Sequence, residues 1–394
     1  MRRLCEVAAY FTQLGFTAFG GPAAHITLME RQFVERRRWL EREHFLDMIS
    51  AINLIPGPNS TQLALSLGYL RAGLPGLLVA GICFIVPAVI IILPLAYFYV
   101  NYGQTPDAAV VLRYVGAAVL AVVASAVFRL IKASIKDRFT LAVALLAMIA
   151  ALLGHWRGLP LADLAIVASA AALGIVRSSR ASKRVLPILL PIPLAIFIAP
   201  AGLSLMALLF LKIGSTLYGS GYLLLPYLRA NFVIAHHWLS ERQLLDSVAV
   251  GQVTPGPLLT TATFIGYLLG SRPEFGAGFG GSFGGAVCGA LMATAAIFAP
   301  SFVFVAVLGR LLPRLRKSSL ARGALDSMNA AVVSLIGVTL LWMIPPVLSG
   351  PGWPLPLGIA CVILGVLVRW NVNPTWLILA AAGMGLGAVA VGGG

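Results

Sequence analysis

The sequence predicts an all-α polytopic membrane protein that contains two repeats of inverted topology. Hydrophobic residues make up 59% of the 394 residues and charged residues only 10%, against roughly 25% charged residues in a soluble domain. Apolar runs of about 20 residues, the length that crosses a bilayer as a helix, recur along the chain. In addition, a stretch near the N-terminus occurs again in the second half of the chain.

The repeated stretch covers residues 15–58 and 214–257, which align without a gap and are identical at 12 of 44 positions. An internal repeat of this kind fixes the organisation of a fold. We therefore assign residues 1–184 to the first membrane repeat, 185–202 to a connecting crossing segment and 203–394 to the second repeat. The matched pairs include Gly20 and Gly219, Trp39 and Trp238, Asp47 and Asp246, and the triplets Pro56-Gly57-Pro58 and Pro255-Gly256-Pro257.

Each repeat is expected to open with short helices interrupted by glycine and proline. In the first repeat these pieces are 5–19, 23–35, 43–55 and 60–73. Helices of this length reach roughly 20–24 Å, too short to cross a hydrocarbon core of about 30 Å. Membranes tolerate such broken or re-entrant helices where protein buries them or where they line a cavity. Long spans are expected at 74–100, 108–131, 284–308, 326–344, 356–368 and 374–391, and a pair of shorter spans at 141–153 and 161–176.

Loop charge predicts that the two repeats have opposite orientations. The basic loops are 36–38, 132–138, 177–184 and 310–322. The loops at 101–107 and 345–354 contain no Lys or Arg. Because cytoplasmic loops collect Lys and Arg, this pattern inverts one repeat relative to the other, and a further crossing at 185–200 would produce the inversion. The same rule accounts for the net charge of +15, so we expect no nucleic-acid partner.

The helix starts that follow the breaks are candidate anion sites. Unpaired N–H groups and a partial positive charge at a helix N-terminus attract anions, and inverted-repeat transporters bind their substrates between the repeats. Packing kinks without a ligand are the alternative interpretation. The candidate residues are Gly20, Gly21, Pro58, Asn59, Ser60, Thr61, Gly219, Ser220, Gly221, Pro257, Thr260 and Thr261.

Several ionisable residues are candidates for coupling or attraction. Asp47 and Asp246 lie nine residues before their triplets, and carboxylates inside a membrane suggest proton pathways. An interfacial ion pair or a helix cap is the alternative. Glu30 aligns with Arg229, so Glu30 is a candidate proton carrier and Arg229 a candidate attractant for an anion, unless both are solvated surface charges. His25 could titrate or donate to an anion, or be structural.

The motifs FTAFGGPAAHI and PGPNSTQLALSLGY, with GSTLYGSGY and TPGPL in the second half, resemble the chromate ion transporter family in its long, two-domain form. The resemblance covers nearly the whole chain. Carried over residue by residue, it implies functional positions at Phe19, Gly20, Gly21, Pro22, His25, Pro56, Gly57, Pro58, Ser60, Gln62 and Gly68, and the second triplet Pro255-Gly256-Pro257 is expected to join the site. The second half departs from the pattern, because Gly221 replaces Pro22 and Leu224 replaces His25.

This resemblance implies a multi-pass protein of the bacterial or archaeal inner membrane. It implies export of chromate from the cytoplasm, driven by the proton gradient, with sulfate as an isosteric competitor. A passive oxyanion channel and a transporter of sulfate or another oxyanion are the alternatives. The sequence contains no catalytic motif such as GxSxG, HExxH or a Walker A loop, so we expect no enzyme, no cofactor and no metal. A homodimer is one arrangement that the sequence leaves open.

Overall fold

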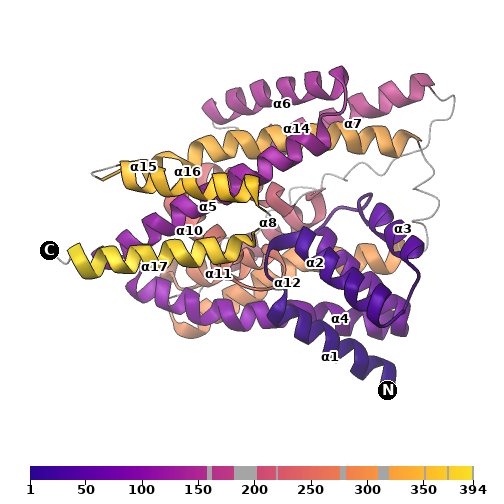
Figure 1. Ribbon diagram of the computed structural model, residues 1–394, viewed down its shortest axis with the longest axis horizontal. Helices are drawn as coiled ribbons and strands as arrows, with labels where there is room; N and C mark the ends of the chain where they lie inside the picture. The colour runs from indigo at the N-terminus through magenta and orange to yellow at the C-terminus, as the bar shows by residue number, and fades with distance from the viewer. Residues whose placement is uncertain are drawn as a thin grey trace. The chain divides into compact units, whose positions relative to one another are not determined.

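In the computed structural model, the structure describes residues 1–157, 162–181, 202–218, 221–275, 281–308, 319–349, 352–370 and 372–392. Every regular element within these ranges is helical (Figure 1), which confirms the all-α prediction. Within these ranges, five helical segments are long and apolar enough to cross a membrane: Asn59–Tyr102, Pro106–Ser134, Phe283–Val307, Arg322–Leu348 and Pro374–Val391. The proposed crossing at 185–200 lies outside the described residues.

The chain divides into two compact units, and each unit takes segments from both sequence repeats. Unit 1 comprises Met1–Pro94, Gly174–Gly221 and Thr254–Leu325. Unit 2 comprises Leu95–Leu173, Tyr222–Val253 and Asp326–Gly394. The compact units therefore interleave the repeats, and the membrane topology of each repeat stays a prediction.

Unit 1 contains the broken helices of the first repeat and the second Pro-Gly-Pro triplet. The long helix α4 carries a non-helical kink at Ala72 and Gly73, so it consists of a short helix and a long one, as the sequence predicts. The last turns of α4 and part of α7 belong to unit 2. The elements are α1 Arg2–Thr17, α2 Gly21–Met29, the π-helix η1 Glu30–Arg36, α3 Arg42–Ile52, α4 Asn59–Tyr102, α8 Leu203–Thr216, η4 Leu258–Thr260, α11 Thr261–Gly270, η5 Pro273–Phe275 and α12 Phe283–Leu308.

Unit 2 is arranged around α5, Pro106–Ser134. A Cβ atom on Gly116 of this helix would lie 2.9 Å from Leu245 and 3.1 Å from Val347. The absence of a side chain at Gly116 therefore lets these two residues pack closely against α5. The remaining elements are α6 Arg138–Trp156, α7 Ala162–Ala181, η2 Gly221–Leu223, α9 Leu224–Leu228, the π-helix η3 Arg229–Ala235, α10 Glu241–Val253, α14 Ser319–Met343, α15 Pro345–Leu348, α16 Pro354–Arg369 and α17 Pro374–Gly392.

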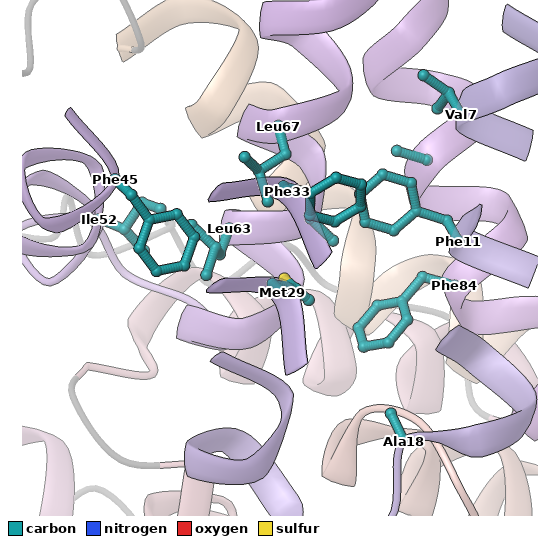
Figure 2. Packing of buried hydrophobic residues seen from close by; sticks show 12 residues of the cluster. Val7, Phe11, Ala18, Met29, Phe33, Phe45, Ile52, Leu63, Leu67 and Phe84 are labelled. Carbon is teal, nitrogen blue, oxygen red and sulfur yellow. The ribbon is translucent and has the colours of Figure 1, made fainter. Parts of the chain in front are cut away.

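The apolar core of unit 1 joins α1, η1, α3 and α4 (Figure 2). The rings of Phe11 and Phe33 stack at 5.3 Å between centroids, and Trp39 packs on Phe33 at 4.5 Å. Aromatic pairs of this kind contribute about 0.5–1.5 kcal/mol beyond the burial of their area. The core thus holds the short helices of the first repeat against α4.

The repeat is visible in the backbone as well as in the sequence. The two π-helices, η1 and η3, occupy aligned positions. Each is followed by a residue with positive φ, Arg38 at 51° and His237 at 53°. Next, the N–H of Trp39 donates to the Phe33 carbonyl at 2.8 Å, and that of Trp238 to the Phe232 carbonyl at 2.8 Å. Aligned residues therefore adopt the same local structure in both halves.

Aligned glycines bring helices into backbone contact at one place in each repeat. A Cβ atom on Gly68 would collide with the Gly76 carbonyl oxygen, and one on Gly266 would collide with the Gly289 carbonyl oxygen. Small residues at helix contacts allow such approach in membranes. The short helix that follows each triplet is thereby fixed against the next long helix.

We expect Gly266→Ala to destabilise the protein by about 1–3 kcal/mol, because the added methyl group meets backbone that cannot rotate away. Gly358→Ala in α16 is the control, since a Cβ atom there has nothing within 4 Å. That control should be neutral or stabilising by up to about 1 kcal/mol. Thermal unfolding of the detergent-solubilised variants measures both effects, and equal unfolding temperatures would contradict the close contact.

Candidate functional site

The two glycine breaks of the repeats meet in unit 1. Gly20, with φ 102°, precedes α2, and Pro22 occupies its first turn. The aligned residue in the second repeat is Gly221. A Cβ atom on Gly221 would lie 3.7 Å from Cγ of Pro22 and 3.8 Å from Leu258. Equivalent positions of the two repeats therefore lie close together.

Each Pro-Gly-Pro triplet is bonded to the break of the other repeat. The N–H of Gly57 donates to the Leu217 carbonyl at 2.5 Å. Reciprocally, the N–H of Gly256 donates to the Ala18 carbonyl at 3.0 Å. Ala18 aligns with Leu217, and Gly57 with Gly256, so the two bonds are equivalent under the repeat. We call this meeting point the break junction; it comprises Ala18, Gly20, Gly21, Pro22, Gly57, Leu217, Gly221 and Gly256.

Positive φ angles explain why glycine occupies the junction. Gly21 has φ 78°, Gly57 has φ 130° and Gly256 has φ 99°. Side chains other than glycine's are strained in this region of φ. At Gly57 space is also lacking, because a Cβ atom would collide with Nε2 of Gln62 and lie 2.7 Å from Oγ of Ser301.

Buried polar side chains lie beside the first triplet, where Gln62 and Ser301 approach Gly57, and at the Ala18 carbonyl, which His25 contacts. His25, Thr61, Gln62 and Ser301 are each 0% exposed. Among the described residues, one polar atom of each has no hydrogen-bond partner: His25 Nδ1, Thr61 Oγ1, Gln62 Oε1 and Ser301 Oγ. Asn59 Oδ1 is in the same situation. Buried polar atoms are nearly always paired with protein, water or ligand, so this polar cluster is suited to receive a small polar ligand.

Two of the polar side chains also hold the local backbone. Gln62 Nε2 donates to the Pro56 carbonyl at 2.5 Å, across the triplet. Asn59 Nδ2 donates to Oδ1 of Asn53 at 2.6 Å, which ties the start of α4 to the end of α3. The turn at the first triplet is therefore held by side chains that keep one acceptor oxygen each unpaired.

His25 anchors the first break. Its Nε2 lies 3.0 Å from the Ala18 carbonyl, so Nε2 carries the proton in this contact. The ring meets Phe84 of α4 edge-on at 5.6 Å, and Figure 2 shows Phe84 above Ala18. Leu224 occupies the aligned position in the second repeat and cannot make this bond. His25 therefore has the structural role that was one of its two interpretations. Its Nδ1 atom has no partner among the described residues.

The helix starts differ between the repeats. In the first repeat α2 and α4 begin as α-helices at Gly21 and Asn59. In the second repeat 3₁₀ turns, Gly221–Leu223 and Leu258–Thr260, precede α9 and α11. The hydroxyls of Thr260 and Thr261 donate to the Pro257 and Leu258 carbonyls. At the start of α11 the second repeat therefore uses its threonine hydroxyls internally, whereas the start of α4 in the first repeat keeps polar atoms available.

The aligned charges Glu30 and Arg229 both form ion pairs, with the signs exchanged. Glu30 pairs with Arg42 at 3.1 Å in unit 1, and Arg229 pairs with Glu241 at 2.7 Å in unit 2. Arg42 aligns with Glu241. The side chain of Arg229 is 6% exposed and that of Arg42 is 76% exposed. Each pair ties a π-helix to the first turn of the next helix, and Arg229 is not a solvated surface charge.

The two aligned aspartates have different surroundings. Asp246 is buried in unit 2 and accepts a hydrogen bond from the Tyr99 hydroxyl at 2.8 Å. Asp47 is only half-buried, on α3 of unit 1. The aligned pair therefore does not form two equal proton sites.

The structure places the remaining candidate residues as follows. Phe19 and Pro56 are half-buried beside the break and the first triplet, and Pro58, Ser60, Pro255 and Pro257 are buried. Gly219 and Ser220 lie outside the described residues. Ser301 was not among the sequence candidates. The sequence contains one indication of this residue. When the alignment of the repeats is extended into the long helices, Pro300-Ser301 aligns with Pro87-Ala88 of the first repeat.

The profile of a family described as Chromate transporter matches residues 5–175 and again residues 204–386. The chain belongs to the chromate transporter family. A family of transporters, matched over both halves, is in keeping with the apolar helices of a multi-pass membrane protein, with the plasma membrane as its expected location.

Curated relatives of this family member extend over most of its length. The chromate transport protein of Cupriavidus metallidurans is 29% identical over 352 residues, covering 84% of this chain and 80% of that protein. That of Pseudomonas aeruginosa is 28% identical over 353 residues, 85% of this chain and 79% of that protein. The probable chromate transport protein of Synechococcus elongatus is 30% identical over 283 residues, 68% of this chain and 70% of that protein. No solved structure matches the chain.

Proposed function

We propose that this protein exports chromate from the cytoplasm and that the proton gradient drives the transport. The observation that carries the proposal is the break junction, where the Gly/Pro breaks and the triplets of both repeats meet beside unpartnered buried polar atoms. Membership of the chromate transporter family and relatives named as chromate transport proteins support chromate as the substrate.

In this proposal the junction replaces part of the hydration shell of the anion. The first turns of α2 and α4 have N–H groups without partners in their own helices, and a helix N-terminus favours negative charge. Hydroxyl and amide groups of the polar cluster add hydrogen bonds with direction. Sulfate has the same tetrahedral shape and charge, so it would compete for this site.

Proton coupling is assigned to the carboxylates, and Asp246 is the stronger candidate. A carboxylate that is 2% exposed and has a tyrosine hydroxyl as partner is costly to keep charged inside a membrane. Uptake of a proton at this position would favour a different arrangement of the helices around it. Asp47, which is half-buried, would contribute less, and Glu30 already has Arg42 as a partner.

The test is uptake of labelled chromate into inside-out membrane vesicles, with and without an imposed proton gradient. We expect gradient-dependent uptake that excess sulfate reduces. Asp246→Asn should abolish the effect of the gradient, whereas Asp47→Asn should retain most of it. Uptake that ignores the gradient in the wild type would identify a passive channel. Gradient-driven uptake that survives both substitutions together would refute the coupling role.

A further inference from the structure

Ser301 is a buried hydroxyl that the helix around it does not use. It follows Pro300 in α12 and is 0% exposed. A buried serine or threonine in a helix commonly donates to the carbonyl four residues earlier, as Thr294 does to Ala290 at 2.7 Å in the same helix. The Ser301 hydroxyl has no hydrogen-bond partner among the described residues, so it is available for a partner that the protein does not supply.

The hydroxyl lies against the first Pro-Gly-Pro triplet. A Cβ atom on Gly57 would be 2.7 Å from Ser301 Oγ and would collide with Gln62 Nε2. Ser301 and Gln62 therefore approach the same glycine. Gln62 is also fully buried, and its unpaired atom is an acceptor oxygen, suited to a water or to a proton on a ligand. Ser301 brings to this contact a hydroxyl donor that no protein group uses among the described residues, and the second N–H of the Gln62 amide lies beside it.

The aligned position in the first repeat has no such group. Ala88 aligns with Ser301, and a Cβ atom on Gly256 would lie 3.1 Å from Cβ of Ala88. The second triplet therefore faces a methyl group where the first faces a hydroxyl. Since the second triplet packs against its long helix with a methyl group at this position, the hydroxyl is not needed to pack a Pro-Gly-Pro triplet against a long helix.

We propose that Ser301 contacts the transported oxyanion, its hydroxyl donating a hydrogen bond to one of the anion's oxygens beside the first triplet. This inference rests on the proposed function, because it assigns the ligand of that site. It makes the binding contacts unequal, with Ser301 of the second repeat acting on the triplet of the first. Because this hydrogen bond is made to the charged ligand, away from water, its loss should weaken binding of the anion more than it lowers the stability of the fold.

The test compares chromate uptake by Ser301→Ala, Ser301→Thr and Ala88→Ser in inside-out vesicles. We expect Ser301→Ala to raise the half-saturating chromate concentration about tenfold, the effect of losing one hydrogen bond to a charged group. Ser301→Thr keeps the hydroxyl and should restore most of the affinity. Ala88→Ser should leave the half-saturating concentration unchanged, because it adds a hydroxyl at the aligned position of the other repeat.

Thermal unfolding of each purified variant separates binding from folding. The inference is supported if Ser301→Ala has the unfolding temperature of the wild type but a higher half-saturating chromate concentration. An unchanged half-saturating concentration in Ser301→Ala overturns it and leaves the proposed function intact, and so does a Thr variant as impaired as the Ala variant. Absence of chromate uptake by the wild type would overturn the proposed function and this inference with it.

Discussion

Gly57→Ala should abolish transport and lower the stability of the protein. The substitution adds a methyl group at φ 130°, which costs about 1–3 kcal/mol in backbone strain. The same methyl group would collide with the Gln62 amide and crowd the Ser301 hydroxyl. Because the N–H of Gly57 bonds to the break of the second repeat, a shift of this residue would also open the junction.

Gly21→Ala is the matched control for this prediction. Gly21 also has a positive φ, 78°, but a Cβ atom there has nothing within 4 Å. It should therefore show backbone strain alone, with a smaller loss of unfolding temperature and partial uptake. Chromate uptake and thermal unfolding of both variants provide the comparison. Equal losses in the two would show that crowding at Gly57 is unimportant.

The second large effect is expected at the ion pair of the second repeat. Arg229→Ala leaves Glu241 without its partner, 2.7 Å away in the wild type, and removes a guanidinium that packs over Trp342 at 4.8 Å. Breaking a buried pair from one side costs about 3–5 kcal/mol. Arg42→Ala removes the aligned partner in the first repeat, where the arginine side chain is 76% exposed, and should cost at most about 1 kcal/mol.

The exchanged double variant, Arg229→Glu with Glu241→Arg, gives the second repeat the charge order of the first. We expect it to recover most of the unfolding temperature lost by Arg229→Ala, measured in detergent. Failure to recover would mean that the pair depends on the surroundings of each charge. Chromate uptake by the same variant tests the anion-attracting role of Arg229, since a stable variant without uptake would require the arginine at that position.

The elements of this fold could be predicted from the sequence where composition and spacing decide them. The sequence predicts a short helix at 60–73 followed by a long span from 74, and the backbone is non-helical at Ala72 and Gly73, where the two meet. The Gly/Pro breaks and the span at 284–308, observed as Phe283–Leu308, were also predicted. Such features depend on residues that start or stop a helix and on the length of an apolar run relative to the thickness of the membrane, and both can be read from the sequence.

The partners of the candidate site residues could not be predicted in the same way. Arg229 was expected to attract an anion or to be solvated, yet it is buried and paired with Glu241. Ser301 is not among the sequence candidates, because its alignment with Ala88 marks the position in the repeat but does not show which turn the side chain contacts. Both facts depend on tertiary contacts, between residues 12 positions apart for Arg229 and Glu241 and between the two repeats for Ser301.

The reciprocal bonds of the break junction also bear on how the protein is made. The N–H of Gly57 finds its partner, the Leu217 carbonyl, only in the second half of the chain, and the Ala18 carbonyl, which His25 also contacts, receives the Gly256 N–H from there. During synthesis, the N-terminal half therefore emerges without either of these two bonds, and the junction closes only after the second triplet has been added. Contacts so distant in sequence slow folding, and they leave the half-made protein as the stage most exposed to misassembly.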